Sequence, residues 1–277
     1  MQWNWLLGLV YGAFGGLFEF LPASPQVHQV LVQKLTGVSV SGYGMSLAVH
    51  LGALSAVILA YYAKINKLYW EHKLLKQPRR SRKRQPDVVS LMQLRLLKTA
   101  AVPVVLACFL APWLSQQLGR LWLMALMVIL CGIVVLLPNY MARANKDARS
   151  ISPLDALLIG LSGMLGALPG FSRVATMLSV GSMRGVDRAF GLDFTYLLAI
   201  PALVALCITD IAMIIIVGDP QAGILFIPGV MACIAAFGCG VAGIHLLRFL
   251  AVKVGFESFA YYNWGLALFA LIIYIIG

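Results

Sequence analysis

The stretch that decides the fold is residues 12–28, GAFGGLFEFLPASPQVH. It lies in a strongly apolar part of the chain, yet it carries an acid, Glu19, and a histidine, His28. Glycines recur at spacings of three to four before Glu19, so a helix here presents a smooth face that ends in the carboxylate. Pro22 and Pro25 predict a break in that helix, because proline lacks an N–H donor and crowds the preceding turn.

The composition indicates a membrane environment for this stretch. Of the 277 residues, 61% are hydrophobic and 11% are charged, whereas a soluble domain carries roughly 25% charged residues. A broken helix at membrane depth is tolerated only where it packs in protein or lines a polar cavity, and an ionisable residue there is by default a functional-site hypothesis. We therefore expect an all-α integral membrane protein that forms one membrane domain over residues 1–277.

Apolar runs predict six membrane-spanning helices, because each approaches the roughly 20 residues that a bilayer requires. The predicted spans are residues 45–63, 99–117, 121–138, 194–217, 224–247 and 259–276. Two further apolar segments, near residues 5–33 and 156–188, are interrupted by prolines and made of pieces too short to span. We interpret both as re-entrant helical hairpins.

The two halves of the chain resemble each other around these hairpins. Glycines followed by Leu21-Pro22-Ala23-Ser24 are echoed by glycines followed by Leu168-Pro169-Gly170-Phe171-Ser172. One hairpin plus three spans makes an odd number of crossings, so the second copy enters from the opposite face. The pattern predicts an inverted-topology repeat, about 1–138 and about 154–277, with the binding site between the interrupted segments.

The net charge of +11 follows the membrane edges and does not indicate a nucleic-acid partner. Lys and Arg dominate residues 64–98, whose core QPRRSRKRQP repels itself, and we expect a mobile cytoplasmic loop there. Anionic lipid head groups are a minor candidate ligand for that loop. The positive-inside rule then places both termini outside.

Polar side chains from the two interrupted segments form one candidate site. Arg173 follows a Pro-Gly break, where the free N–H groups of a new half-helix favour an anion, and a guanidinium suits phosphate or carboxylate. We predict catalytic roles for Glu19, His28 and Arg173, with His28 as nucleophile or general acid/base and Glu19 as its orienter, base or metal ligand. The remaining candidates, as ligand-binding residues, are Ser24, Gln26, Ser172 and Thr176.

The residues alone leave alternatives open, both for the function of the site and for two other ionisable residues. A transporter for an anionic amphiphile needs the same groups as a hydrolase, and an Arg–Glu pair can simply cross-link two hairpins. Two other ionisable residues lie inside spans. His50 fits a hydrogen-bonded packing histidine or a site residue, and Asp210 fits an interfacial or hydrogen-bonded residue more than a proton relay.

The two interrupted segments resemble the motifs of the undecaprenyl-diphosphate phosphatase family (BacA/UppP type). The first family motif, approximately E-G-x-x-E-F-L-P-x-S-S-x-G-H, corresponds to residues 15–28, and the second, approximately P-G-x-S-R-S-G-A-T, corresponds to residues 169–177. The resemblance extends to DALLIGL, FTYLLAIPAL, VHLGALSAV and FAYYN, and covers most of the chain except the basic loop.

The resemblance implies a multi-pass enzyme of the bacterial plasma membrane with its active site facing outside. Such an enzyme hydrolyses a polyprenyl diphosphate to the monophosphate, recycles the lipid carrier for peptidoglycan and cell-wall synthesis, and can confer bacitracin resistance. It also implies Mg2+ or Ca2+ as cofactor, with Glu19 as a metal ligand. The partners are the polyprenyl diphosphate and the bilayer, and a homodimer stays an open alternative.

Several motif positions depart from the family pattern: Gly15, Pro25, Val174 and Met177 replace a glutamate, a serine, a serine and a threonine. The family also often has an arginine at the position of Asn263. Losing one of two carboxylates weakens a site for a hard cation. The alternatives to a working phosphatase are a non-hydrolytic lipid-phosphate transporter or flippase and a catalytically silent homologue that binds lipid phosphate.

Overall fold

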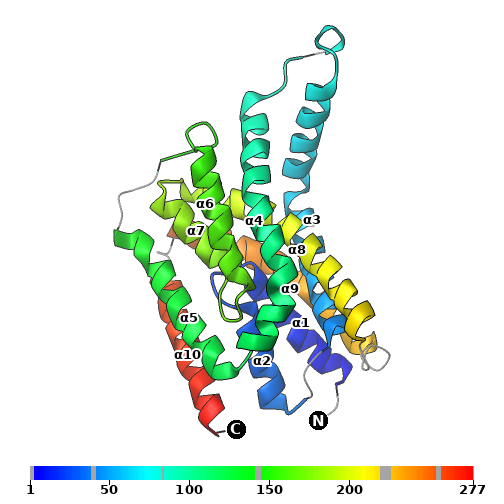
Figure 1. The fold of residues 1–277 in the computed structure, drawn as a ribbon, viewed down its shortest axis with the longest axis vertical. Helices are drawn as coiled ribbons and strands as arrows, with labels where there is room; N and C mark the ends of the chain where they lie inside the picture. Colours follow the sequence, from blue (N-terminus) through cyan, green and yellow to red (C-terminus); the bar gives the residue numbers. More distant parts are fainter. Residues whose placement is uncertain are drawn as a thin grey trace.

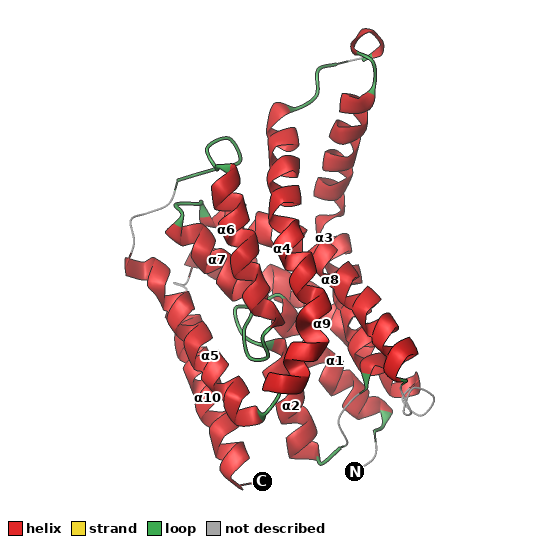
Figure 2. Cartoon of the chain, in the orientation of Figure 1, coloured by secondary structure: helices red, strands yellow, loops and turns green. Residues whose placement is uncertain are grey.

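The computed structural model describes residues 3–38, 42–82, 84–140, 145–218, 226–253 and 257–276. Over these ranges the chain is helical and contains no β-strand (Figures 1 and 2). Its α-helices are α1 (Trp5–Glu19), α2 (Pro25–Thr36), α3 (Tyr43–Lys76), α4 (Val88–Leu118), α5 (Leu121–Leu136), α6 (Pro153–Met164), α7 (Arg173–Met183), α8 (Arg188–Val217), α9 (Phe226–Lys253) and α10 (Glu257–Ile276).

Six of the described helices are long and apolar enough to cross a membrane. They are α3, α4, α5 with its short continuation to Tyr140, α8, α9 and α10. This confirms the predicted number of spans and the all-helical membrane class. The shorter helices α1, α2, α6 and α7 lie among them (Figure 1).

Residues 64–98 differ from the predicted mobile loop. Helix α3 continues to Lys76 and α4 already begins at Val88, so the two helices form an arm that projects beyond the rest of the molecule (Figure 1). Buried Glu71 pairs with Arg84 and accepts the Asp87 backbone N–H at 2.8 Å. The sequence pattern counted the repulsion between cations but not these acid partners, which hold the arm together.

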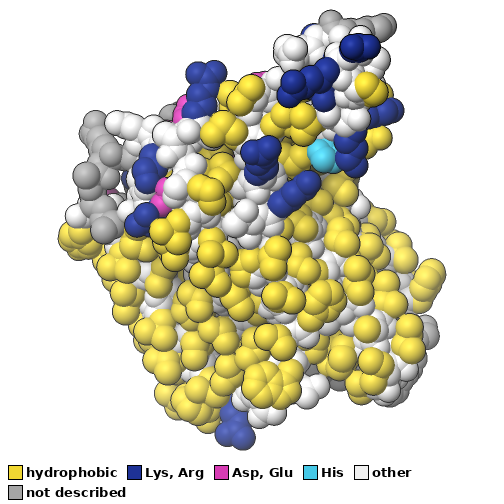
Figure 3. All heavy atoms as spheres, turned by 45° about the horizontal axis from the view of Figure 1, so that its top comes forward, with side chains coloured by type: hydrophobic (Ala, Val, Ile, Leu, Met, Phe, Trp, Pro, Cys, Tyr) yellow, Lys and Arg dark blue, Asp and Glu magenta, His cyan; other side chains and the backbone are white. Residues whose placement is uncertain are grey.

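Lys and Arg side chains gather at the arm end of the molecule, above a broad hydrophobic belt (Figure 3). The starts of α1 and α3 and the end of α10 lie at the other end (Figure 1). The basic residues and the chain termini therefore lie at opposite ends, as expected if the basic segment is cytoplasmic and both termini are outside.

The predicted glycine face of α1 packs against α9. A Cβ at Gly8, Gly12 or Gly16 would lie within 2.1–2.3 Å of a backbone carbonyl oxygen of α9. The facing residues, Pro228, Ala232 and Ala236, recur at the same spacing of four. Small residues at such a contact let the helix backbones approach closely. Close packing of this kind drives helix association in a membrane, where the hydrophobic effect does not favour helix contacts over lipid contacts.

Both predicted helix breaks are present. Helix α1 ends at Glu19 and α2 begins at Pro25, with Ser24 as its N-cap. Helix α6 ends at Met164, and α7 begins at Arg173 after a turn in which Gly170 has φ +108°, a conformation that favours glycine. The repeat boundaries stay predictions.

Candidate functional site

Three side chains satisfy the carbonyl groups that the first helix break leaves free. The Ser172 hydroxyl donates to the Leu21 carbonyl at 2.9 Å, so the second break is fastened to the first. The Tyr196 hydroxyl donates to the Phe20 carbonyl at 3.0 Å. Asn263 Nδ2 donates to the Pro22 carbonyl at 2.8 Å. Because a buried carbonyl without a donor is costly, these bonds stabilise the first break, and the Ser172 bond holds it beside the second.

This arrangement brings Glu19 and Arg173 together. Glu19 ends α1 and Arg173 begins α7, and Arg173 Nη1 lies 3.8 Å from Glu19 Oε1. Their side chains are only 12% and 9% exposed. The separation is too long for a hydrogen bond, and Nη1 has no hydrogen-bond partner among the described residues. The guanidinium thus keeps a donor available in a buried place.

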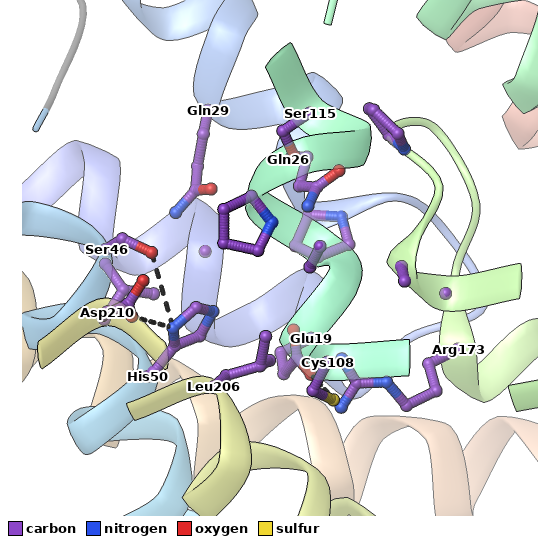
Figure 4. Close-up of a pocket in the computed structure, with 18 of the residues that line it drawn as sticks. Glu19, Gln26, Gln29, Ser46, His50, Cys108, Ser115, Arg173, Leu206 and Asp210 are labelled. Atoms are coloured by element: carbon purple, nitrogen blue, oxygen red, sulfur yellow. Dashed lines mark hydrogen bonds and ion pairs between the residues drawn. The ribbon is translucent and has the colours of Figure 1, made fainter. Parts of the chain in front are cut away.

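A cavity of about 480 Å³ opens beside this ion pair (Figure 4). Helices α1, α2, α3, α4 and α8 and the turn before α7 line it, and its polar lining includes Glu19, Gln26, Gln29, Ser46, His50, Arg173 and Asp210. Gln26 Oε1 is also buried without a partner in the described chain. Buried polar groups are normally hydrogen-bonded, so an unpartnered donor and an unpartnered acceptor on two residues that line one cavity favour a polar ligand.

The prediction that His28 joins Glu19 and Arg173 in one cavity is wrong. His28 is buried outside the cavity lining, with its ring stacked on Phe18 at a centroid distance of 3.5 Å. Its Nδ1–H donates to the Ser24 carbonyl at 2.6 Å, and its Nε2 accepts from the Tyr262 hydroxyl at 2.7 Å. Both ring nitrogens are therefore occupied, and this placement does not favour the catalytic role, which stays a prediction.

The predicted ligand-binding residues divide in the same way. Gln26 and Ser172 line the cavity, whereas Ser24 and Thr176 do not. The Ser24 hydroxyl caps α2, and the Thr176 hydroxyl donates to the carbonyl of Arg173 one turn back. The Ser172 hydroxyl is taken up by the Leu21 carbonyl and by the first turn of α7. These three hydroxyls hold the backbone at the breaks.

Sequence reasoning missed the contribution of two ionisable residues to the cavity. His50 on α3 and Asp210 on α8 both line it, and His50 Nδ1 lies 2.7 Å from Asp210 Oδ2 (Figure 4). The sequence analysis noted each residue separately and gave each a packing alternative. The default that intramembrane ionisable residues mark functional sites, applied to both together, could have found the pair.

The residues around Glu19 do not fit a divalent cation held by the protein alone. Over the described ranges no group of three or more His, Cys, Asp and Glu side chains could hold a metal ion. Position 15, one turn before Glu19, carries no donor, and a Cβ there would lie 2.5 Å from Gln29 Nε2. Mg2+ and Ca2+ prefer six or more hard oxygen ligands. The predicted Mg2+ or Ca2+ stays a prediction that this donor set does not favour.

His28→Ala is expected to lower thermal stability while leaving kcat within about tenfold of wild type, whereas loss of a true general base costs roughly 10²–10⁴-fold. The reason is that His28 stacks on Phe18 and bonds Tyr262 instead of facing the cavity. Thermal unfolding and phosphate release measured on the same preparation check this. Tyr262→Phe, which removes one hydrogen bond and keeps the ring, should be milder; a stable His28→Ala without turnover would contradict the placement.

The fold and the cavity define a class, a multi-pass membrane protein with a buried arginine–glutamate pair facing a polar cavity. The family model described as "Bacitracin resistance protein BacA" matches residues 8–269, and the chain belongs to this family. The undecaprenyl-diphosphatase of Nocardioides sp. is 28% identical over 281 residues, covering 99% of this chain and 98% of that protein. The undecaprenyl-diphosphatase of Cutibacterium acnes is 31% identical over 209 residues, covering 73% and 72%.

Proposed function

We propose that this protein hydrolyses undecaprenyl diphosphate to the monophosphate and inorganic phosphate. The observation that carries the proposal is the buried Arg173 guanidinium, which keeps an unbonded Nη1 donor beside Glu19 at the cavity. A planar guanidinium suits phosphate oxygens, and phosphoryl transfer depends mainly on positioning and on stabilising charge. The names of the relatives supply the substrate class.

The described residues suggest a role for each polar group. Arg173 binds the non-bridging oxygens of the terminal phosphate and stabilises their charge as the bridging bond breaks. Glu19, at 3.8 Å, keeps the guanidinium aimed at the cavity. The Gln26 carboxamide, with its unpartnered Oε1, is a second polar contact on the cavity wall. A homodimer stays a prediction.

The residues that depart from the family motifs leave Arg173 and the polar cavity in place. Gln29 Nε2 occupies the space next to Gly15, so a carboxamide stands where a side chain at position 15 would reach. Val174 and Met177 are buried in the hydrophobic core and do not line the cavity. Pro25 lines it from the first position of α2, where a missing N–H costs nothing. The replaced positions therefore change the packing around Arg173 more than they change the access of a ligand to its guanidinium.

The proposal places the site on the outer face of a bacterial plasma membrane. The cavity lining includes Tyr43 at the start of α3 and Gln116 near the end of α4, whereas the basic arm joins the opposite ends of these two helices. If the arm is cytoplasmic, as the positive-inside rule predicts, the cavity faces outward. There the enzyme recycles the lipid carrier of cell-wall synthesis, which accounts for bacitracin resistance.

Two re-entrant hairpins related by an inverted repeat complete the proposal. The paired short helices α1–α2 and α6–α7, each broken before a serine-capped helix, support it. The hydrogen bond from Ser172 to the Leu21 carbonyl joins the two breaks, and such a junction is expected where two inverted repeats meet.

Removal of divalent cations is expected to lower the initial rate of phosphate release less than about threefold, because the single carboxylate beside Arg173 cannot supply the several oxygen ligands that Mg2+ or Ca2+ requires. The measurement compares purified protein in excess EDTA with the same protein in millimolar Mg2+ or Ca2+. Loss of turnover in EDTA that either cation restores would contradict this prediction.

The function is tested by phosphate release from undecaprenyl diphosphate by the purified full-length chain in lipid vesicles. Release above that of empty vesicles supports the hydrolase. Binding or translocation of the lipid phosphate without release would favour the transporter, and binding alone would favour the catalytically silent homologue. Either result would overturn the proposal.

A further inference from the structure

The proposed hydrolysis leaves one role without a residue, the group that takes a proton from the attacking nucleophile. Ser24, Ser172 and Thr176 hydroxyls all bond the backbone at the helix breaks. His28 uses both ring nitrogens outside the cavity. None of the residues predicted from the motifs, apart from Glu19, is therefore placed to act as nucleophile or base, and Glu19 faces Arg173.

His50 is placed differently. It lines the cavity with its side chain 19% exposed, and its Nδ1 bonds the carboxylate of Asp210, whose side chain is 8% exposed. Ser46 Oγ lies 3.4 Å from the same nitrogen. Figure 4 shows the other side of the ring turned away from Asp210 toward the cavity that Glu19 and Arg173 also face. Within the described part of the chain, the hydrogen bonds of the His50 ring are all made by Nδ1.

An imidazole held by a carboxylate through Nδ1–H is fixed in the tautomer whose Nε2 lone pair can accept a proton. The carboxylate also stabilises the imidazolium that forms. Placing ionisable side chains in the low-dielectric interior of a membrane protein costs free energy. An Asp–His pair there, which joins two helices and residues 160 apart in sequence, is therefore by default a functional-site hypothesis. Its position on the wall of the proposed phosphate cavity points to acid–base chemistry.

We propose that His50 is the general base of the hydrolysis and that Asp210 positions it; this inference rests on the proposed function. Water attacks the terminal phosphorus, and its oxygen forms the new P–O bond. The bond to the bridging oxygen breaks, and its electron pair stays on the polyprenyl monophosphate. The water proton passes to His50 Nε2, which returns it to the released phosphate or to solvent.

The test uses the full-length chain in vesicles with undecaprenyl diphosphate. His50→Gln is expected to lower kcat on the order of 100-fold or more, the usual contribution of a general base, with KM changed less than about threefold. Imidazole in the buffer should restore part of the activity of His50→Ala. The matched control is His245→Gln, on the exposed side of α9 outside the cavity lining, which should turn over like wild type.

Asp210→Asn distinguishes a positioning role from general destabilisation. It should lower kcat roughly tenfold or more, and His50→Gln/Asp210→Asn should lose no more than His50→Gln alone, because residues that act as a unit are not additive. If His50→Gln fails to fold, the Asp210→Asn kcat and the imidazole response of His50→Ala decide the question.

The failures of the two proposals are separable. A wild-type protein that releases no phosphate overturns the hydrolase and the base together. A hydrolytic wild type whose folded His50→Gln variant keeps its kcat within about threefold overturns the base alone, since that loss lies far below the range expected for a general base. So does a double variant whose loss is the product of the two single losses.

Discussion

Arg173→Ala is expected to lower phosphate release from undecaprenyl diphosphate on the order of 10³-fold, the range seen when a key charge-stabilising donor or transition-state arginine is lost. Arg173 is the arginine whose guanidinium lies at the cavity with Nη1 unbonded within the described chain. Its removal also leaves the Glu19 carboxylate buried without its cationic neighbour, which adds repulsion toward a diphosphate.

Arg173→Lys tests whether the positive charge at position 173 is sufficient or whether the planar guanidinium is needed. Lysine keeps the positive charge but loses the planar pair of donors that fits phosphate oxygens, so we expect an intermediate rate. Initial rates at saturating substrate, with binding measured separately, check both variants. Arg80→Ala on the exposed arm is the matched control and should turn over normally.

Two outcomes would contradict this prediction. One is an Arg173→Ala variant that is folded and releases phosphate within about tenfold of wild type, because the loss of such a donor costs more than that. The other is an equal loss in Arg80→Ala, which would show that overall positive charge, and not the guanidinium at the cavity, determines the rate.

The sequence was sufficient for the parts of the fold that local chemistry determines. Long apolar runs indicated the six spans, and the prolines near residues 22 and 169 indicated both helix breaks. The spacing of glycines before Glu19 indicated a smooth helix face, and in the structure that face packs against α9. Each of these features depends on residues close together in sequence.

The site was predictable only in part, because its contacts join distant segments. Glu19 and Arg173 were assigned to one candidate site because the two breaks resemble each other in sequence, and in the structure their side chains lie 3.8 Å apart. The side to which α2 turns His28 depends on Phe18 and Tyr262, and Tyr262 belongs to the last helix of the chain. Helical spacing gives the face that a residue occupies, but not the neighbour that this face meets.

The arm shows a similar limit. Repulsion within the basic segment predicted a loop, but Glu71 on α3 and Asp87 at the N-cap of α4 offset part of that charge. Hydrogen bonds from Lys67 and Ser90 lower the pKa of Asp87 to about 2, so it stays charged over the physiological range. A count of charges along the sequence treats these acids as a small minority, whereas their placement decides whether the helices continue.

Gly16→Ala is expected to destabilise the protein by about 1–3 kcal/mol or more, as overpacking does where neighbours cannot yield. The new Cβ would lie 2.2 Å from the Ala236 carbonyl oxygen and 2.5 Å from the Ala236 Cα. These are backbone atoms of α9, so relief requires a shift of the whole helix and not of a flexible side chain. Because α1 carries Glu19 at its end, the same shift should also lower phosphate release.

The matched control is Gly238→Ala, on α9 itself, where nothing lies within 4 Å of the new methyl group. Alanine is favoured over glycine in a helix interior by about 1 kcal/mol, so this variant should be as stable as wild type or slightly more stable. Unfolding midpoints of both variants, measured by circular dichroism at one scan rate, give the comparison. Equal midpoints would contradict the close α1–α9 contact. A lower midpoint in Gly16→Ala alone would show that this contact stabilises α1, the helix that carries Glu19 at its end.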